Sequence, residues 1–342
     1  MGHTCLSLAL SSSPLTQPVL SSTDTESLRR TRHHSRHLLG VAIGLLSVTA
    51  VASLTIPDRA EARVVTRTLR SASTSSLFDS LRGRSRKLRA RFVNPSRVGS
   101  LPMLRELFGD SVSRRAGVHV ATVSEPLDAT PFSFIMMRPF TDKVSGRIGA
   151  YRIGFFPSEQ RAARSVAYAN PEGFLEVTAG NQDTPVSEHF RLKDFLTHDQ
   201  GAVWPKYLVL REPLVDKLEL VMDELQSMGV AVDRLRVMSG FRTPQYNAKG
   251  VGAGGRVQDS RHQYGDAADV YVVNGARDWM SDLDRDGRVD TRDARLLALA
   301  AERVERAHPE LVGGIGVYPA TAAHGPFVHI DVRGAKARWG AL

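Results

Sequence analysis

The sequence predicts an α+β fold, in which a small, mostly antiparallel sheet has helices packed on one of its faces. Two segments in the C-terminal half have helical periodicity, and several short apolar runs beside them are typical of strands. The 342 residues are 42% hydrophobic and 24% charged. That is enough apolar material for one large or two medium domains with real cores, and it excludes wholesale disorder.

The expected elements of the C-terminal half follow from the spacing of their apolar residues. Leucines and valines recur at helical intervals through 213–229, a segment that ends at Gly229, and a second helix is expected at 291–307. Four β-rich runs, bounded by turn residues, are the expected strands: 234–243, 267–273, 313–319 and 326–334.

The middle of the chain is expected to be rich in short strands. The runs VHVATV, FSFIMM, AYRIGFF and FLEVTA are separated by Pro, Gly and Asn between about 116 and 182. We expect residues 101–184 to form a small β-rich module or an N-terminal extension, and residues 185–342 to form the main domain.

The basicity of the chain is confined to its N-terminal part. Residues 1–100 contain 15 basic and 5 acidic residues and carry a charge of +10. The rest of the chain carries −1, so the net charge is +9. This distribution argues against specific nucleic-acid binding by the folded part. Residues 63–100 are expected to be a flexible basic linker, which serves either as a solvated tether or as a contact with an anionic envelope surface.

The extreme N-terminus has the pattern of an export signal. A charge-free apolar stretch at 38–56 follows a basic segment and precedes the small-residue triplet Ala60-Glu61-Ala62. Residues 1–62 are therefore expected to be a cleaved signal peptide or a retained N-terminal membrane anchor. Either interpretation predicts an exported protein of the periplasm or cell envelope.

Two separated motifs carry the strongest chemical signal. The segment SRHQYGDAAD (260–269) contains His262 and Asp269, and His329 lies in the later strand-like run. Cys5 is the single cysteine of the chain, so a metal must be held by histidines and carboxylates. Two imidazoles and one carboxylate suit Zn²⁺ with a fourth position open to water, and we expect such a site in a cleft on the sheet.

These motifs resemble the zinc D-Ala-D-Ala carboxypeptidase and endopeptidase family, which shares its fold with the hedgehog signalling domain. The resemblance implies zinc binding by His262, Asp269 and His329. The element SGFRT (239–243) is similar to the part of the family that contains an arginine for the substrate carboxylate, which implies that role for Arg242. His324 matches a position that polarises the scissile carbonyl. Together with EHFRLKDFL and GGIGVYP, the resemblance spans about 185–340.

The function implied by the resemblance is that of an exported zinc metallopeptidase. Its substrates would be D-amino-acid-containing bonds in peptidoglycan stem peptides or cross-links. The family includes carboxypeptidases and endopeptidases, which differ in how far the cleft extends past Arg242. The alternative is a non-catalytic, zinc-bearing module of the same fold that binds a cell-wall peptide or a protein.

One departure from the family pattern concerns the general base. Many members have Asp or Glu three residues before the final histidine, and Pro326 occupies that position here. Asp331 lies two residues past His329 on the same face of a strand, so it either accepts the proton or supports the ligand histidine. Asp266 is a third possibility.

An acidic loop before the second helix predicts a calcium site. Residues 282–293 have oxygen donors at loop positions 1, 3, 5, 9 and 12 and glycine at position 6. The loop resembles an EF-hand and more closely a dockerin loop. The alternative is an acidic loop that caps the helix and pairs with its own arginines. The expected Ca²⁺ ligands are Asp282, Asp284, Asp286, the Arg288 carbonyl, Asp290 and Asp293.

Overall fold

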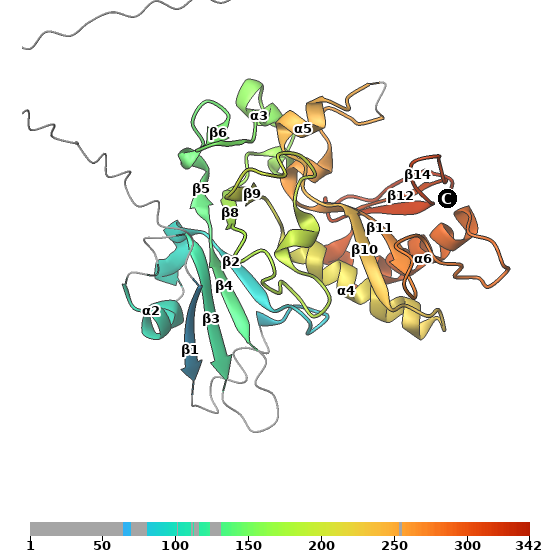
Figure 1. The fold of residues 1–342 in the computed structure, drawn as a ribbon, viewed down its shortest axis with the longest axis horizontal. Coiled ribbons are helices and arrows are strands. Elements are labelled where there is room, and N and C mark those ends of the chain that lie inside the picture. Colours follow the sequence, from blue (N-terminus) through green and yellow to red (C-terminus); the bar gives the residue numbers. More distant parts are fainter. Residues whose placement is uncertain are drawn as a thin grey trace, which may run out of the picture. The chain divides into compact units, whose positions relative to one another are not determined.

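The protein is described by a computed structural model, which covers residues 64–69, 81–100, 102–110, 112, 116–123, 131–252 and 255–342. All of them fall within one compact unit, Ile56–Leu342 (Figure 1). The fold is α+β with small, mostly antiparallel sheets, as the sequence predicts. The segment expected to be a signal peptide or membrane anchor lies outside the described residues.

The largest sheet has five strands in the order β10-β11-β13-β12-β14. Neighbouring strands pair antiparallel except β12 and β14, which pair parallel. The strands are β10 (Arg234–Ser239), β11 (Ala267–Val273), β12 (Gly314–Tyr318), β13 (Phe327–Asp331) and β14 (Ala337–Gly340).

One face of this sheet is covered by helix α6 (Thr291–Ala307), which contacts β11, β12 and β13. Helix α4 (Glu212–Ser227) packs against α6 (Figure 1). Because side chains alternate along a strand, every second residue of each strand joins this core, and the residues between them face the opposite side. The buried apolar residues on the helix-covered face include Ala268, Val270, Val272, Ile315, Val317, Val328 and Ile330.

A second sheet has the order β1-β3-β4-β2 and its own hydrophobic cluster. Its elements are β1 (Val64–Leu69), β2 (Ala90–Val93), α2 (Pro102–Phe108), β3 (Gly117–Val123) and β4 (Phe132–Met136). The smaller elements are β5 (Arg138–Pro139), β6 (Arg147–Ile148), β7 (Tyr151–Arg152), α3 (Pro157–Gln160), β8 (Gly173–Val177), β9 (Lys206–Leu208) and α5 (Pro244–Ala248).

Most expected elements are confirmed. The strand at 267–273 and the helix at 291–307 have the predicted bounds, and the helix expected at 213–229 runs from Glu212 to Ser227. The run AYRIGFF forms strand only at Tyr151–Arg152. Buried residues between Ile148 and Val177 belong to the larger core, so that core extends across position 184.

The structure differs from expectation at 63–100, where a flexible linker was predicted. This segment contributes β1 and β2 to the second sheet, and several of its basic side chains are paired with acids of the main domain. Arg89 Nη2, for example, lies 3.1 Å from Glu188 Oε2. Long-range strand pairing and ion pairing, which composition does not predict, involve the described parts of this segment, 64–69 and 81–100. Fewer of its charges are therefore free for an anionic surface.

Within the described part of the chain, no helix combines the length and apolar character needed to cross a membrane.

His119 on β3 is a buried titratable group in the second core. Its ring meets Phe108 edge-on at 5.1 Å between centroids, and its Nδ1 has no hydrogen-bond partner among the described residues. Burial lowers the pKa of His119, because the charged imidazolium loses its hydration.

This burial predicts acid sensitivity. The unfolded chain binds a proton at His119 near pH 6.5, above the folded pKa, so stability is full above that pH and is lost as pH falls toward the folded pKa. We expect the melting temperature to drop between pH 7 and pH 5, and to drop less in His119→Leu. Parallel pH profiles of the two proteins would remove His119 as a source of the sensitivity.

Candidate active site

The candidate site is built on a single row of residues across the five-stranded sheet. Ser239 pairs with Asp269, Asp269 with His329, His329 with Gly316, and Gly316 with Trp339. All five therefore lie on one face of the sheet, opposite the face covered by α6. This register brings together residues that are up to 100 positions apart in the sequence.

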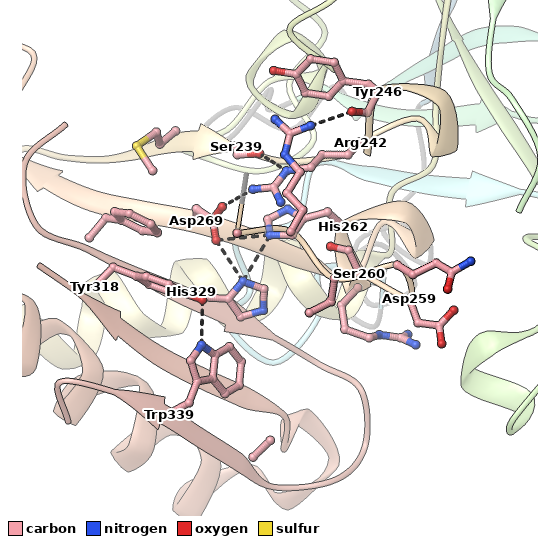
Figure 2. A pocket seen from close by; sticks show the side chains of 18 of the residues that line it. Ser239, Arg242, Tyr246, Asp259, Ser260, His262, Asp269, Tyr318, His329 and Trp339 are labelled. Carbon is pink, nitrogen blue, oxygen red and sulfur yellow. Dashed lines mark hydrogen bonds and ion pairs between the residues drawn. The ribbon is translucent and has the colours of Figure 1, made fainter. Parts of the chain in front are cut away.

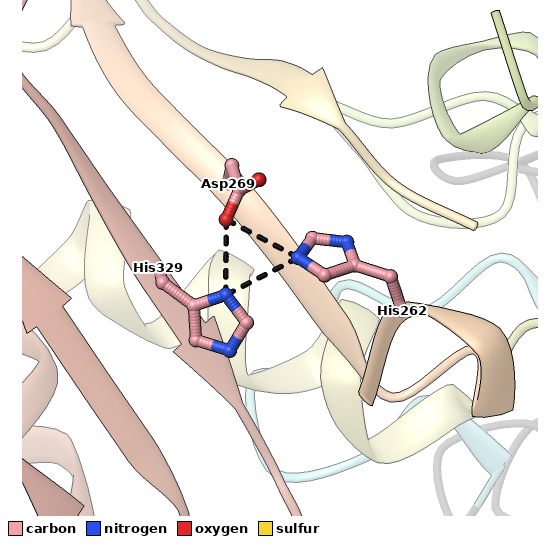
Figure 3. Close-up of side chains that lie close together, drawn as sticks. All are labelled: His262, Asp269 and His329. Atoms are coloured by element: carbon pink, nitrogen blue, oxygen red, sulfur yellow. Dashed lines mark hydrogen bonds and ion pairs between the residues drawn. The ribbon is translucent and has the colours of Figure 1, made fainter. Parts of the chain in front are cut away.

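Three ligand atoms converge at the centre of this row (Figure 3). His262 Nε2 lies 3.2 Å from His329 Nδ1 and 3.2 Å from Asp269 Oδ1, and His329 Nδ1 lies 2.9 Å from Asp269 Oδ1. Ligand atoms of a tetrahedral zinc site with bonds of about 2.0–2.1 Å are about 3.3 Å apart. The spacing of the three atoms therefore fits Zn²⁺.

The outer nitrogens of both histidines already have acceptors. His262 Nδ1 lies 2.7 Å from the Gly240 carbonyl oxygen, and His329 Nε2 lies 3.1 Å from Asp331 Oδ2. Each outer N–H donates to its acceptor, which leaves a lone pair on each inner nitrogen of the neutral rings. Two lone pairs and a carboxylate oxygen then face one another, an arrangement that requires a proton or a metal cation between them.

The surroundings act differently on the three members of the cluster. Burial lowers the pKa of His329, but hydrogen bonds to Asp269 and Asp331 outweigh burial and raise it, so a metal competes with a proton at that ring. Burial opposes ionisation of Asp269, but His262, His329 and Arg242 outweigh it and hold the pKa of this carboxyl well below its usual range. Burial lowers the pKa of His262, so its imidazole is neutral near pH 7. Arg242 Nη2 donates to Asp269 Oδ2, and Arg242 Nε donates to Ser239 Oγ at 2.8 Å. The other oxygen, Oδ1, is the one that faces the histidines.

Two glycines in β12 make room for the groups that surround His329. A Cβ at Gly314 would lie 2.4 Å from Asp331 Oδ2, and one at Gly316 would lie 2.3 Å from Trp339 Nε1. Trp339 consequently lies over the sheet, with its ring 5.1 Å from that of His329. The glycines of GGIGVYP thus leave the space that Asp331 and Trp339 occupy beside His329.

Asp331 is buried and surrounded by donors. Its carboxylate accepts from Gly314 N, Arg333 N and the Arg333 guanidinium, besides His329. Burial raises its pKa, but His329 and Arg333 outweigh burial and lower the pKa far below the usual range, which makes it a poor proton acceptor. Of the two roles open to Asp331, the geometry favours orientation of His329. Asp266 is likewise fully buried and paired with Arg261.

The three ligand atoms lie in a cleft of about 1130 Å³. Figure 2 shows Arg242 and Tyr246 toward the Ser239 side of the pocket, and Trp339 on the far side of His329. His324 also lines this cleft, and its Nδ1 lies 2.8 Å from the Gly325 carbonyl oxygen. The structure therefore brings all the residues expected at the zinc site into or behind one cavity.

Sequence reasoning did not single out several cleft residues. His198, Arg256 and Trp339 all line the cleft. His198 lies just past the EHFRLKDFL element, which could have directed attention to it. Burial lowers its pKa, and the nearby positive charges of Arg236, Arg242 and Arg256 lower it further. No sequence pattern marks Arg256 or Trp339, whose places depend on contacts distant in the chain.

The acidic loop 282–293 lies away from this cleft and brings some of its expected ligands together. Oxygens of Asp282, Asp284 and Asp293 all lie within 4.8 Å of one another. Asp293 is buried and caps α6, since its oxygens accept from the backbone N–H groups of Leu283 and Asp290 at 2.6 and 2.8 Å. Asp282 Oδ1 is buried and has no hydrogen-bond partner among the described residues.

Arg292 forms ion pairs with the other carboxylates of this loop. Its guanidinium pairs with Asp286, lies 3.0 Å from Asp290 Oδ2 and is within 3.9 Å of Asp284. This is the arrangement of the alternative considered for the loop, an acidic cap that pairs with its own arginine. Calcium binding by Asp286 and Asp290 requires that Arg292 move away, so it stays a prediction.

The orienting role of Asp331 predicts a specific defect. Asp331→Asn should weaken zinc binding by about 10–100-fold, because the amide holds the His329 N–H less strongly. Turnover, if present, should recover at high zinc. Zinc affinity is measured by competition with a chelator, and an unchanged affinity together with lost turnover would restore Asp331 as the general base.

The competition between Arg292 and calcium is also testable. If the loop binds Ca²⁺, the ion stabilises only the folded chain, so the melting temperature should be higher in calcium than in chelator. Arg292→Gln should enlarge this difference, whereas Asp284→Ala combined with Asp286→Ala should abolish it. Identical melts in calcium and chelator for both wild type and Arg292→Gln would leave the loop as a helix cap alone.

Comparison with known proteins adds no family to this description. No protein-family model matches the chain, and no curated protein is significantly similar to it. A function must therefore be argued from the residues of the site.

Proposed function

We propose that this chain is a zinc metallopeptidase that hydrolyses D-amino-acid-containing bonds of bacterial peptidoglycan. The observation that carries the proposal is the convergence of two imidazole nitrogens and one carboxylate oxygen at 2.9–3.2 Å in an open cleft. Three protein ligands beside an accessible cavity are typical of catalytic zinc, whereas structural zinc usually has four protein ligands.

The residues present fit zinc. His262, Asp269 and His329 would hold the ion, and their outer contacts already fix both imidazole tautomers. When bound, zinc supplies Lewis-acid polarisation of a carbonyl and lowers the pKa of a water molecule. Arg242 keeps Asp269 in place through Oδ2, so it acts as a positioning residue in this proposal. Its expected grip on a substrate carboxylate stays a prediction.

His324 is the best candidate for proton transfer. Its Nδ1–H donates to the Gly325 carbonyl, so the neutral ring presents a lone pair at Nε2. Nε2 would accept a proton from the attacking water and return it to the departing amine. This role differs from the oxyanion contact that the resemblance implies, because that contact needs a proton on Nε2. A base at His324 would also replace the acidic residue that many family members have at the position of Pro326.

The peptidoglycan substrate is proposed from the sequence motifs and the export signal. The cleft supports a peptide substrate by its size and by its lining, which combines aromatic rings with arginines. Residues outside the described part of the chain would place the domain in the periplasm or cell envelope, where calcium is also available to the acidic loop.

A second candidate is a zinc-bearing module that binds peptide without cutting it. One observation favours it: Asp259 and Asp269 are the carboxylates among the described cleft residues, and both have basic partners. No free carboxylate is thus available there as a general base. The two candidates differ only in turnover, so an activity measurement separates them.

The test is release of new amines from purified peptidoglycan and from peptides ending in D-Ala-D-Ala. We expect zinc-dependent cleavage by the full chain, loss of both zinc and cleavage in His262→Ala, and a drop of about 10²–10⁴-fold in kcat in His324→Ala with zinc retained.

Gln263→Ala is the matched control, since Gln263 lies beside His262 but contacts backbone oxygens away from the metal ligands. A zinc-loaded wild type that binds these peptides without cutting them would favour the binding module.

A further inference from the structure

Arg256 is held in a fixed position at the edge of the cleft. Its Nη1 donates to the Tyr246 carbonyl oxygen at 2.6 Å, and its guanidinium lies 4.3 Å from the centre of the Tyr246 ring. Its side chain also lies directly over Gly250, where a Cβ would approach Arg256 Cδ to 2.5 Å. A long, flexible side chain is thus pre-organised by three separate contacts.

Arg256 differs from the other arginines that line the cleft. Arg164, Arg242, Arg261 and Arg333 each have a carboxylate within ion-pair distance. Among the described residues, Arg256 has no acidic partner, and its Nε and Nη2 have no hydrogen-bond acceptor. Arg256 is only partly buried, and an ordered guanidinium without a counter-ion favours an anionic ligand, because binding then costs little further side-chain freedom.

The surroundings of Arg256 add to this positive potential. Arg242 and Arg256 line the same cleft, so two guanidinium groups contribute positive charge to it. His198 lines the same cleft, and the positive charges of Arg242 and Arg256 lower its pKa in addition to burial. The carboxylates of the described cleft lining, Asp259 and Asp269, pair with other arginines. Among the described residues, no carboxylate of the cleft is left to pair with Arg256.

We propose that Arg256 forms a carboxylate-binding subsite of the cleft, which anchors an anionic group of the substrate. The inference rests on the proposed peptidase function and names the substrate feature that it requires. The free nitrogens Nε and Nη2 lie on one edge of the guanidinium, the edge that binds both oxygens of a carboxylate in a bidentate pair. Two sources of this group are available in peptidoglycan: the C-terminal carboxylate of a stem peptide, and the α-carboxylate of a γ-linked D-glutamate.

Binding of small acids and their amides to the zinc-loaded full chain tests the subsite without turnover. The first probe pair is N-acetyl-D-alanine and N-acetyl-D-alaninamide. The second pair is N-acetyl-D-glutamine, whose α-carboxylate and γ-amide imitate a γ-linked D-glutamate, and its α-amide. We expect wild type to bind the acid at least 10-fold more tightly than the amide in one pair, and that pair identifies the source.

Arg256→Gln should reduce this preference to less than 2-fold while it retains zinc. Arg164→Gln is the matched control, since it removes a cleft arginine that Asp259 neutralises, and it should keep the preference. Gly250→Ala retains Arg256 but displaces its side chain, so it should also weaken the preference, and it serves as the test if Arg256→Gln does not fold.

Three results would overturn the subsite: no preference in wild type, a preference that persists in Arg256→Gln, or an equal loss in Arg164→Gln. Peptide cleavage is measured separately. Cleavage without a preference for acids removes the subsite and leaves the peptidase, whereas a preference without cleavage removes the peptidase and leaves the subsite.

Discussion

The register between β11 and β13 is the constraint on which the candidate site depends. Pairing of Asp269 with His329 places both ligands on the face opposite α6, and the same register aligns Ser239 and Trp339 with them. A shift of one residue would turn the ligands into the helix-covered core and expose its valines. Burial of the apolar face against α6 therefore fixes the register, and the register fixes the positions of Asp269 and His329.

Buried charged residues connect the helices of the core to the candidate site. Lys217 on α4 is fully buried, and its Nζ donates to Glu305 Oε1 at 2.7 Å and to the Asp331 carbonyl oxygen at 2.8 Å. Asp331 in turn bonds His329. Removal of one member leaves a buried charge unpaired, which is strongly destabilising. Helix packing and ligand orientation are thus parts of one hydrogen-bonded chain, and substitutions in α4 can affect the site.

The sequence predicts those parts of the fold whose cause is local. The strand at 267–273 and the helix at 291–307 follow from their apolar patterns, and the motif that contains His262 and Asp269 indicates two candidate ligands. Composition predicts a flexible linker at 63–100 and does not reveal β1 and β2, because these strands pair with β3 and β4 farther along the chain. The orienting contacts of Asp331 and the isolation of Arg256 could not be predicted for the same reason, since both depend on which distant groups lie within hydrogen-bond reach.

The two candidate metal sites differ in how far the protein satisfies its own charges. In the acidic loop, Arg292 pairs with Asp286 and Asp290, and backbone N–H groups donate to Asp293, whereas Asp282 Oδ1 has no partner among the described residues. At the histidine cluster, Gly240 and Asp331 take the outer N–H groups and leave only acceptors inside. A proton or a cation must lie between those acceptors, and hydrogen bonds to Asp269 and Asp331 raise the pKa of His329, so a metal would compete there with a proton. Arg256 is the opposite case. It is a cation without an acidic partner among the described residues, and the ligand proposed for it is an anion.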